Sequence, residues 1–122
     1  MEKEGIKSLA DLIYDPEDDL LLSKKAADGI AEKFYKELGD NAEKFVSFYK
    51  ANKDKTDELF EKYINLNSLS SLFNSMMNEK AMQRLIYKNL LSMEKDLRKN
   101  SYDLKKAYKE IDKKIKRYYT DF

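Results

Sequence analysis

Between positions 86 and 118, residues that are apolar with one exception recur at alternating intervals of three and four and end with a double step of seven, which is the spacing of one helix face. A face with this spacing packs nearly parallel or antiparallel to neighbouring helices. The pattern therefore predicts a long C-terminal helix over about residues 79–119. Its packing face comprises Ile86, Leu90, Met93, Leu97, Asn100, Leu104, Ala107, Ile111 and Tyr118.

Asn100 is a polar member of this face and allows two interpretations. Asn readily adopts the left-handed conformation that ends a helix, and Ser101 would then cap a following helix. Alternatively, a polar Asn on an apolar seam fixes the register of paired helices, in which case the helix is continuous. The sequence leaves both open, so the long helix is either broken near Asn100 or available as a self-interface.

The same periodicity predicts shorter helices in the first two-thirds of the chain. They are placed at residues 2–14, 16–38, 41–52, 55–65 and 68–77. The polar stretch between the third and the fourth is short enough that these two could also form one bent helix. Together with the C-terminal helix, these elements predict a single all-α domain, a compact bundle of five to six helices.

Local residues indicate where the second helix begins and ends. Asp15 before Pro16 is typical of a helix start, because Asp accepts hydrogen bonds from first-turn amides and proline has no amide to leave unpaired. Gly39 is typical of a helix end. Gly29, inside the helix, costs up to about 1 kcal/mol relative to Ala, and we expect it to allow the close approach of another helix.

Composition favours a folded helical domain. Of the 122 residues, 42% are hydrophobic and 39% are charged, which suits amphipathic helices with solvated outer faces. Three Gly and one Pro are too few for the many tight turns of an all-β fold. No stretch approaches the roughly 18 apolar residues of a membrane span, and the N-terminus is charged where a signal peptide is apolar. We therefore expect a cytoplasmic protein, unless a leader has been removed.

The missing residue types exclude several chemistries. The chain has neither His nor Cys, so it lacks the commonest general base, the usual zinc and copper ligands and any catalytic thiol. Acidic residues cluster at 15–19, but this segment lacks the Gly and Glu positions of a calcium loop. No Gly-rich phosphate loop or nucleophile elbow occurs. We therefore predict no cofactor, no metal site and no enzymatic activity.

Residues 65–78 contain no charged side chain. A helical apolar stripe in such a segment is typical of a central helix or, alternatively, of an adaptable contact surface, because Met side chains repack around varied partners. We predict partner contacts by this stripe and by the seam of the long helix. The residues are Leu69, Leu72, Phe73, Met76, Met77, Met93, Asn100 and Ala107.

The two parts of the chain carry opposite charge. Residues 1–78 have 11 Lys against 16 acids, a net charge of −5, and residues 79–122 have 13 Lys and Arg against 7 acids, a net charge of +6. Either the basic helix lies against the acidic part, or it faces a polyanion. The candidate polyanion-binding column is Tyr102, Lys106, Lys109, Lys113, Lys116 and Arg117.

These features predict a non-enzymatic protein–protein interaction module of the adaptor, inhibitor, immunity or small-subunit type. Its partner would be another protein or a second copy of the chain. The alternative is binding of nucleic acid or another polyanion through the lysine-rich column. The excess of Lys over Arg, 21 to 3, counts against readout of base edges and bidentate phosphate contacts.

Overall fold

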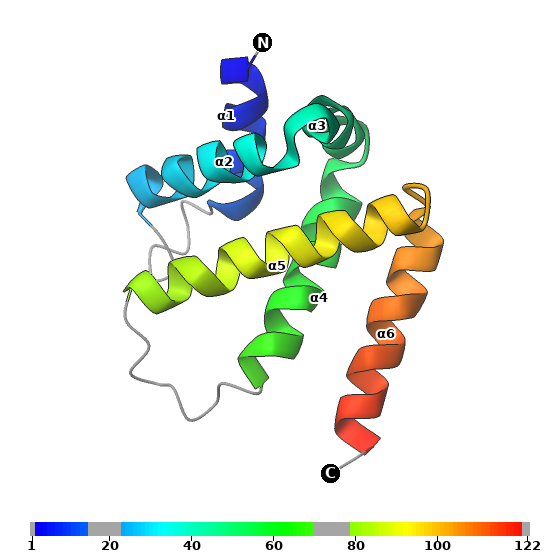
Figure 1. Cartoon of the computed structure of the whole chain (residues 1–122). Coiled ribbons are helices and arrows are strands. Elements are labelled where there is room, and N and C mark those ends of the chain that lie inside the picture. The colour runs from blue at the N-terminus through cyan, green and yellow to red at the C-terminus, as the bar shows by residue number, and fades with distance from the viewer. Residues whose placement is uncertain (1, 15–22, 70–78, 121–122) are drawn as a thin grey trace.

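The computed structural model describes residues 2–14, 23–69 and 79–120 (Figure 1). Over these ranges the chain forms six α-helices and one 3-10 turn, with no strand and with no helix long and apolar enough to cross a membrane. The elements are α1 (Glu2–Ile13), α2 (Lys24–Leu38), the 3-10 turn η1 (Gly39–Asn41), α3 (Ala42–Ala51), α4 (Lys53–Leu69), α5 (Glu79–Lys99) and α6 (Leu104–Thr120). The predicted all-α bundle is confirmed.

α5 crosses the middle of the bundle and contacts α2, α4 and α6, while α1 packs on α2 and α3 (Figure 1). The apolar face of α5 buries Leu90, Met93 and Leu97, as the spacing of three and four predicts. Closer to α1, the rings of Phe34 and Phe45 meet edge to face, with 5.5 Å between their centroids. One core cluster thus includes residues from all six described helices.

Two helical glycines have opposite surroundings. Gly5 of α1 is buried, and a Cβ at this position would lie 2.7 Å from Cε2 of Tyr35, so glycine allows α1 and α2 to approach this closely. Gly29 of α2 is exposed, and a Cβ there would meet nothing within 4 Å. The expectation that Gly29 allows a close helix contact is therefore wrong, because this residue lies on an outer flank of α2.

The long C-terminal helix is broken near Asn100, so the interpretation that required a continuous helix is wrong. Tyr102 N donates to Leu97 O at 2.7 Å and Ser101 N donates to Arg98 O at 3.2 Å, a pattern typical of helix ends that close through a left-handed residue. The left-handed positions are Ser101 and Tyr102, with φ of 55° and 60°, and not Asn100 as predicted.

Two polar side chains stabilise this turn. Asn100 Nδ2 donates to a main-chain oxygen one helical turn back, at 2.8 Å. Asp103 Oδ1 accepts from the amides of Lys105 at 3.0 Å and Lys106 at 3.4 Å, which makes Asp103 the N-cap of α6. Ser101, predicted as this cap, lies two residues too early, because its left-handed backbone belongs to the end of α5.

The predicted start of the second helix differs from the structure. α2 begins at Lys24, because Ser23 has an extended backbone (φ −71°, ψ 157°) and its side chain accepts from Ala26 N at 3.2 Å. A continuous helix over 16–38 is therefore wrong, and the predicted start at Asp15 and Pro16 lies outside the described residues. The predicted end is confirmed, since Gly39 has a φ of 55° after the last residue of α2.

The boundaries around α4 also differ in part. α3 and α4 are separate helices joined at Asn52, whose φ of −133° and ψ of 41° leave the helical region. α4 continues through Leu69, so the predicted division between helices 55–65 and 68–77 is wrong. Uncharged Asn and Ser side chains in this stretch are compatible with a helix and did not end it. The remainder of the predicted helix, residues 70–77, lies outside the described residues.

Candidate functional site

The structure separates the predicted partner-contact residues, of which two lie in the core, two lie at helix ends and four lie outside the described residues. Met93 and Ala107 have no exposed surface, because they pack inside the bundle. Asn100 is half-buried in the turn between α5 and α6. Leu69 ends α4, and Leu72, Phe73, Met76 and Met77 lie outside the described residues. The apolar seam is therefore covered within one chain, and Met93 and Ala107 offer no surface to a partner.

The exposed face of α5 is basic. Each exposed residue that the structure describes on this helix is Lys or Arg, except Ser92. We define the α5 basic face as Lys80, Arg84, Lys88, Lys95, Arg98 and Lys99. The apolar side of α5 is buried in the core, so helical geometry places the cations on the opposite side. The predicted column did not include this face, although the four-residue steps from Lys80 to Arg84 and Lys88 indicate it.

The outer face of α6 is basic as well. We define the α6 basic face as Lys105, Lys106, Lys109, Lys113, Lys114, Lys116 and Arg117, all of which are exposed. Asp112 is an exposed acid on this helix, and it pairs with Lys62 of α4 at 2.8 Å. Tyr102 does not join the column predicted for it, because it precedes α6 and its ring packs on Phe48, with 5.2 Å between centroids.

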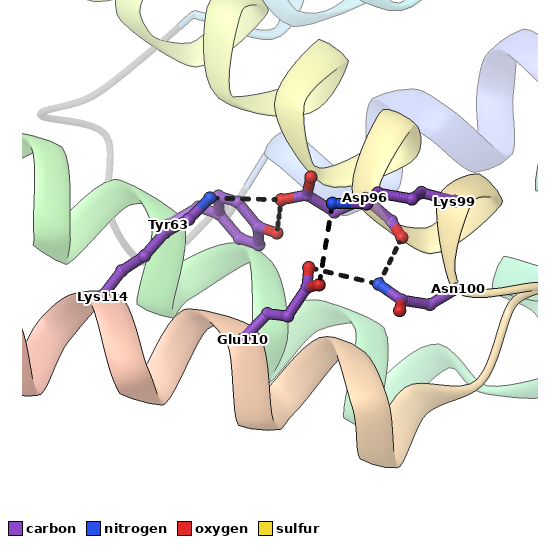
Figure 2. A network of polar contacts seen from close by, with 6 residues as sticks. All are labelled: Tyr63, Asp96, Lys99, Asn100, Glu110 and Lys114. Atoms are coloured by element: carbon purple, nitrogen blue, oxygen red, sulfur yellow. Dashed lines mark hydrogen bonds and ion pairs between the residues drawn. The ribbon is translucent and has the colours of Figure 1, made fainter.

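Two acids of α5 and α6 lie between the helices instead of on the basic faces (Figure 2). Asp96 of α5 accepts a hydrogen bond from the Tyr63 hydroxyl of α4 and lies 3.8 Å from Lys114 Nζ of α6. Glu110 of α6 accepts from Asn100 Nδ2 at 3.2 Å. These contacts tie α4, α5 and α6 together, and they hold both carboxylates between helices, where Asp96 is mostly buried and Glu110 is half-buried.

Glu94 is a more deeply buried acid of α5, with 2% of its surface exposed. Burial raises the pKa of its carboxyl above the ordinary value, and Arg98, whose Nε lies 3.5 Å from Oε1, opposes the rise. Oε1 of Glu94 and the hydroxyl of Tyr102 are buried and have no hydrogen-bond partner among the described residues. Burial, followed by the charge of Glu94, raises the pKa of Tyr102. Glu94 therefore adds no exposed negative charge to the basic region.

Most cations of the two basic faces make no ion pair with another described residue. The pair that joins the acidic and basic parts, Lys62 with Asp112, has its cation on the acidic part. The pairs of Asp96 and Glu110 lie within the basic part. The cations that make no ion pair with another described residue are Lys80, Arg84, Lys88, Lys95, Lys105, Lys106, Lys109, Lys113 and Arg117. Over the described residues, the acidic part therefore does not neutralise the basic faces.

Three tyrosine side chains, those of Tyr49, Tyr63 and Tyr108, have raised pKa values. Burial and hydrogen bonds to carboxylates raise the pKa of Tyr49 and Tyr63. Burial, with the nearby charge of Glu58, raises the pKa of Tyr108 to about 12. These phenols therefore stay protonated at neutral pH. Within the described ranges, no group of three or more acidic side chains is placed to hold a metal ion.

The arrangement as a whole can hold anions at many points along two helices. It offers exposed ammonium and guanidinium groups, and it keeps the carboxylates of Glu94, Asp96 and Glu110 buried or half-buried, while Asp103 and Asp112 are exposed. Comparison of the chain with protein families, curated proteins and solved structures finds no match.

Proposed function

We propose that this chain is a non-enzymatic binding protein that holds a polyanion on the α5 and α6 basic faces. The observation that carries the proposal is the segregation of charge within residues 79–122. All 13 Lys and Arg of this part are exposed, whereas three of its described acids, Glu94, Asp96 and Glu110, are buried or half-buried, and Asp103 and Asp112 are exposed. The resulting positive potential attracts polyanions and accelerates their association.

Repeated cations suit a polymeric anion better than a small one. Lys80, Arg84 and Lys88 follow one another at intervals of about 6 Å along the helix axis, since each residue rises 1.5 Å. A nucleic-acid strand carries one negative charge about every 3.4 Å along its axis. Several cations can therefore contact the phosphates of one strand together, and the release of counterions drives the binding.

Lysine dominates both faces, and this determines the expected specificity. The cations of the two faces are Lys, with the exceptions Arg84, Arg98 and Arg117. Lys lacks the planar fork with which Arg reads guanine edges or binds a phosphate with two parallel hydrogen bonds. We therefore expect binding that is independent of base sequence and that weakens steeply as salt increases.

Charge reversal on α6 tests the proposal. The triple variant Lys106→Glu, Lys109→Glu, Lys113→Glu should weaken binding of a labelled DNA duplex by about tenfold or more. It should also reduce the slope of log affinity against log salt concentration by about 3, because three phosphate contacts are lost. Fluorescence anisotropy titrations at several NaCl concentrations measure both quantities.

A matched variant separates a local effect from an effect of net charge. Lys7→Glu, Lys25→Glu, Lys50→Glu makes the same charge change at exposed positions of the acidic part. This control should retain most of the affinity, and equal losses in the two triple variants would contradict a specific role for the basic faces. Wild-type protein that binds neither duplex DNA nor heparin at low salt would refute the proposal.

Binding of another protein, the function that the sequence favours first, stays a second proposal. It is supported by the uncharged, Met-containing composition of residues 65–78, which suits an adaptable apolar contact. Size-exclusion chromatography with light scattering tests the version in which the partner is a second copy, and a monomer at all concentrations would exclude it. A cytoplasmic location also stays a proposal and suits a nucleic-acid partner.

A further inference from the structure

A groove of about 520 Å³ lies between α2 and α5. Residues that line it include Gly29, Ile30, Lys33, Lys80, Arg84 and Tyr87. Lys80 and Arg84 also belong to the α5 basic face. The groove therefore opens beside the surface that we propose to hold a polyanion.

Charge distinguishes this groove from the one between α1 and α2. Among the residues that the structure describes, three cations and no acid line the α2–α5 groove. The α1–α2 groove, of about 640 Å³, is lined by Asp11, Asp28 and Glu32 together with two lysines. Burial, followed by the nearby charge of Glu37, raises the pKa of Tyr87, but Glu37 does not line the α2–α5 groove. An anionic ligand is therefore favoured between α2 and α5 and disfavoured between α1 and α2.

The α2–α5 groove also has an apolar floor and an aromatic wall. Gly29 leaves room for a ligand, since a Cβ at this position would meet nothing within 4 Å. Ile30 is buried beside it, and Tyr87 is half-buried on the opposite helix. Lys33 Nζ lies 4.5 Å from the centroid of the Tyr87 ring, which holds this cation at the groove wall. The groove thus combines cations with apolar and aromatic surface.

We propose that the α2–α5 groove binds a segment of single-stranded nucleic acid, with phosphates at Lys33, Lys80 and Arg84 and an unpaired base against Tyr87. The inference rests on the proposed function and specifies that the nucleic acid in this groove is single-stranded. The bases of a duplex are paired and stacked, so a duplex presents mainly phosphates to the basic faces. A single strand can place an unstacked base in a groove, and cationic grooves with aromatic side chains are the usual means of binding single strands.

Gly29→Leu tests the inference without a change of charge. The added side chain would occupy open space in the groove, and α2 should not lose stability because Leu forms helices better than Gly. The probes are a labelled oligothymidylate of about 16 nucleotides and a DNA duplex of the same length. We expect the variant to bind the single strand about tenfold more weakly than wild type does, and the duplex equally well.

Two further comparisons control this result. Ser47→Leu adds the same side chain at an exposed position of α3 outside the groove, and it should leave both affinities unchanged. Arg84→Gln in the groove and Arg117→Gln near the end of α6 remove the same charge. The first should reduce single-strand affinity several-fold more than the second, because only Arg84 lines the groove.

The outcomes separate the groove from the proposed function. The inference would be overturned if Gly29→Leu bound the single strand as tightly as wild type does, or if the two Arg variants lost equal single-strand affinity. In either case, duplex binding by the wild-type protein would still support the proposed function. Wild-type protein that binds the duplex as tightly as the single strand would also overturn the inference. Wild-type protein that binds neither probe would remove the proposed function together with the inference.

Discussion

Acidic side chains have different roles in α2 and in the α5–α6 pair. Asp28 and Glu32 of α2 are exposed, and Glu32 pairs with Lys36 one turn away, at 3.3 Å. Asp96 and Glu110 instead lie between helices and hold α4, α5 and α6 together. The acids of α2 thus interact with solvent, while the inward position of Asp96 and Glu110 leaves an outer surface on which cations outnumber the exposed Asp112. The net charge of a segment therefore does not fix the charge of its surface, which also depends on whether its acidic side chains point outward or lie between helices.

Asp96→Ala should disturb this difference most. The substitution removes the carboxylate that accepts from the Tyr63 hydroxyl and pairs with Lys114. We expect the free energy of unfolding to fall by about 2 kcal/mol, since hydrogen bonds to charged groups contribute about 1.5–3 kcal/mol. Urea denaturation followed by circular dichroism measures the change. Glu32→Ala, at an exposed ion pair, should cost at most about 0.5 kcal/mol, and equal losses would contradict the distinction.

Glu110→Ala should have a smaller effect. Its side chain is 34% exposed, so water screens its ion pair with Lys99 and competes for its hydrogen bond with Asn100. We expect a loss of about 1 kcal/mol in the same urea assay. A double-mutant cycle with Asn100→Ala should return a coupling energy of about 0.5 kcal/mol or more. Additive losses would indicate that the two side chains act independently.

Glu94→Gln should change how stability depends on pH. Burial raises the folded-state pKa of Glu94, so the folded state binds this proton more tightly than the unfolded state does. The resulting stability is fully present below the unfolded-state pKa, which is that of an ordinary Glu carboxyl, and is lost as pH rises through the higher folded-state pKa. The Gln side chain does not titrate, so the free energy of unfolding of the variant should rise relative to that of wild type as pH rises. At neutral pH the variant should be the more stable protein.

Thermal unfolding between acidic and neutral pH measures this effect. Arg98 is half exposed and can return to water when its partner is neutral, which keeps the variant free of a buried unpaired cation. Glu43→Gln, an exposed acid of α3, serves as the control and should follow the wild-type profile. Parallel profiles for wild type and Glu94→Gln would contradict the burial argument.

Ser92→Glu should have the smallest effect on stability and a selective effect on binding. It places an acid on the exposed α5 surface among the cations, where no core contact is disturbed. Stability should change by no more than about 0.5 kcal/mol, while duplex affinity at low salt should fall about threefold. Ser92→Gln keeps the size of the new side chain without its charge and should retain wild-type affinity. Unchanged affinity in both variants would place the polyanion elsewhere.

Helix positions were predictable where the local pattern was unambiguous. The apolar spacing predicted the buried face of α5, and a break near Asn100 was one of the two interpretations that the sequence left open. The start of α2 was not predicted, because Asp15 with Pro16 and Ser23 are competing start signals and local sequence does not rank them. The continuation of α4 through Leu69 was missed for a similar reason, since Asn and Ser suit both a helix surface and a cap.

The candidate site was predictable in part. The lysine column of α6 was visible as a helical repeat, and the structure places Lys106, Lys109 and Lys113 on an exposed face. Tyr102 was assigned to that column by extending the repeat through the turn, where left-handed residues change the direction of the chain. The α5 basic face was missed although the four-residue steps of Lys80, Arg84 and Lys88 indicate it, whereas the α2–α5 groove needed the packing of two helices that are distant in sequence.

Sequence alone determined that this protein is helical, that its helices are amphipathic and that its charge is divided between two parts, because these properties depend on residue types and on the 3.6-residue repeat. Only the tertiary structure decided what covers each apolar stripe. An apolar face is buried equally well by its own chain or by another, so the repeat could not tell that Met93 and Ala107 belong to an internal core. The same packing decided that Asp96 and Glu110 point inward, since a carboxylate lies between helices only where partners such as Tyr63 and Asn100 meet it.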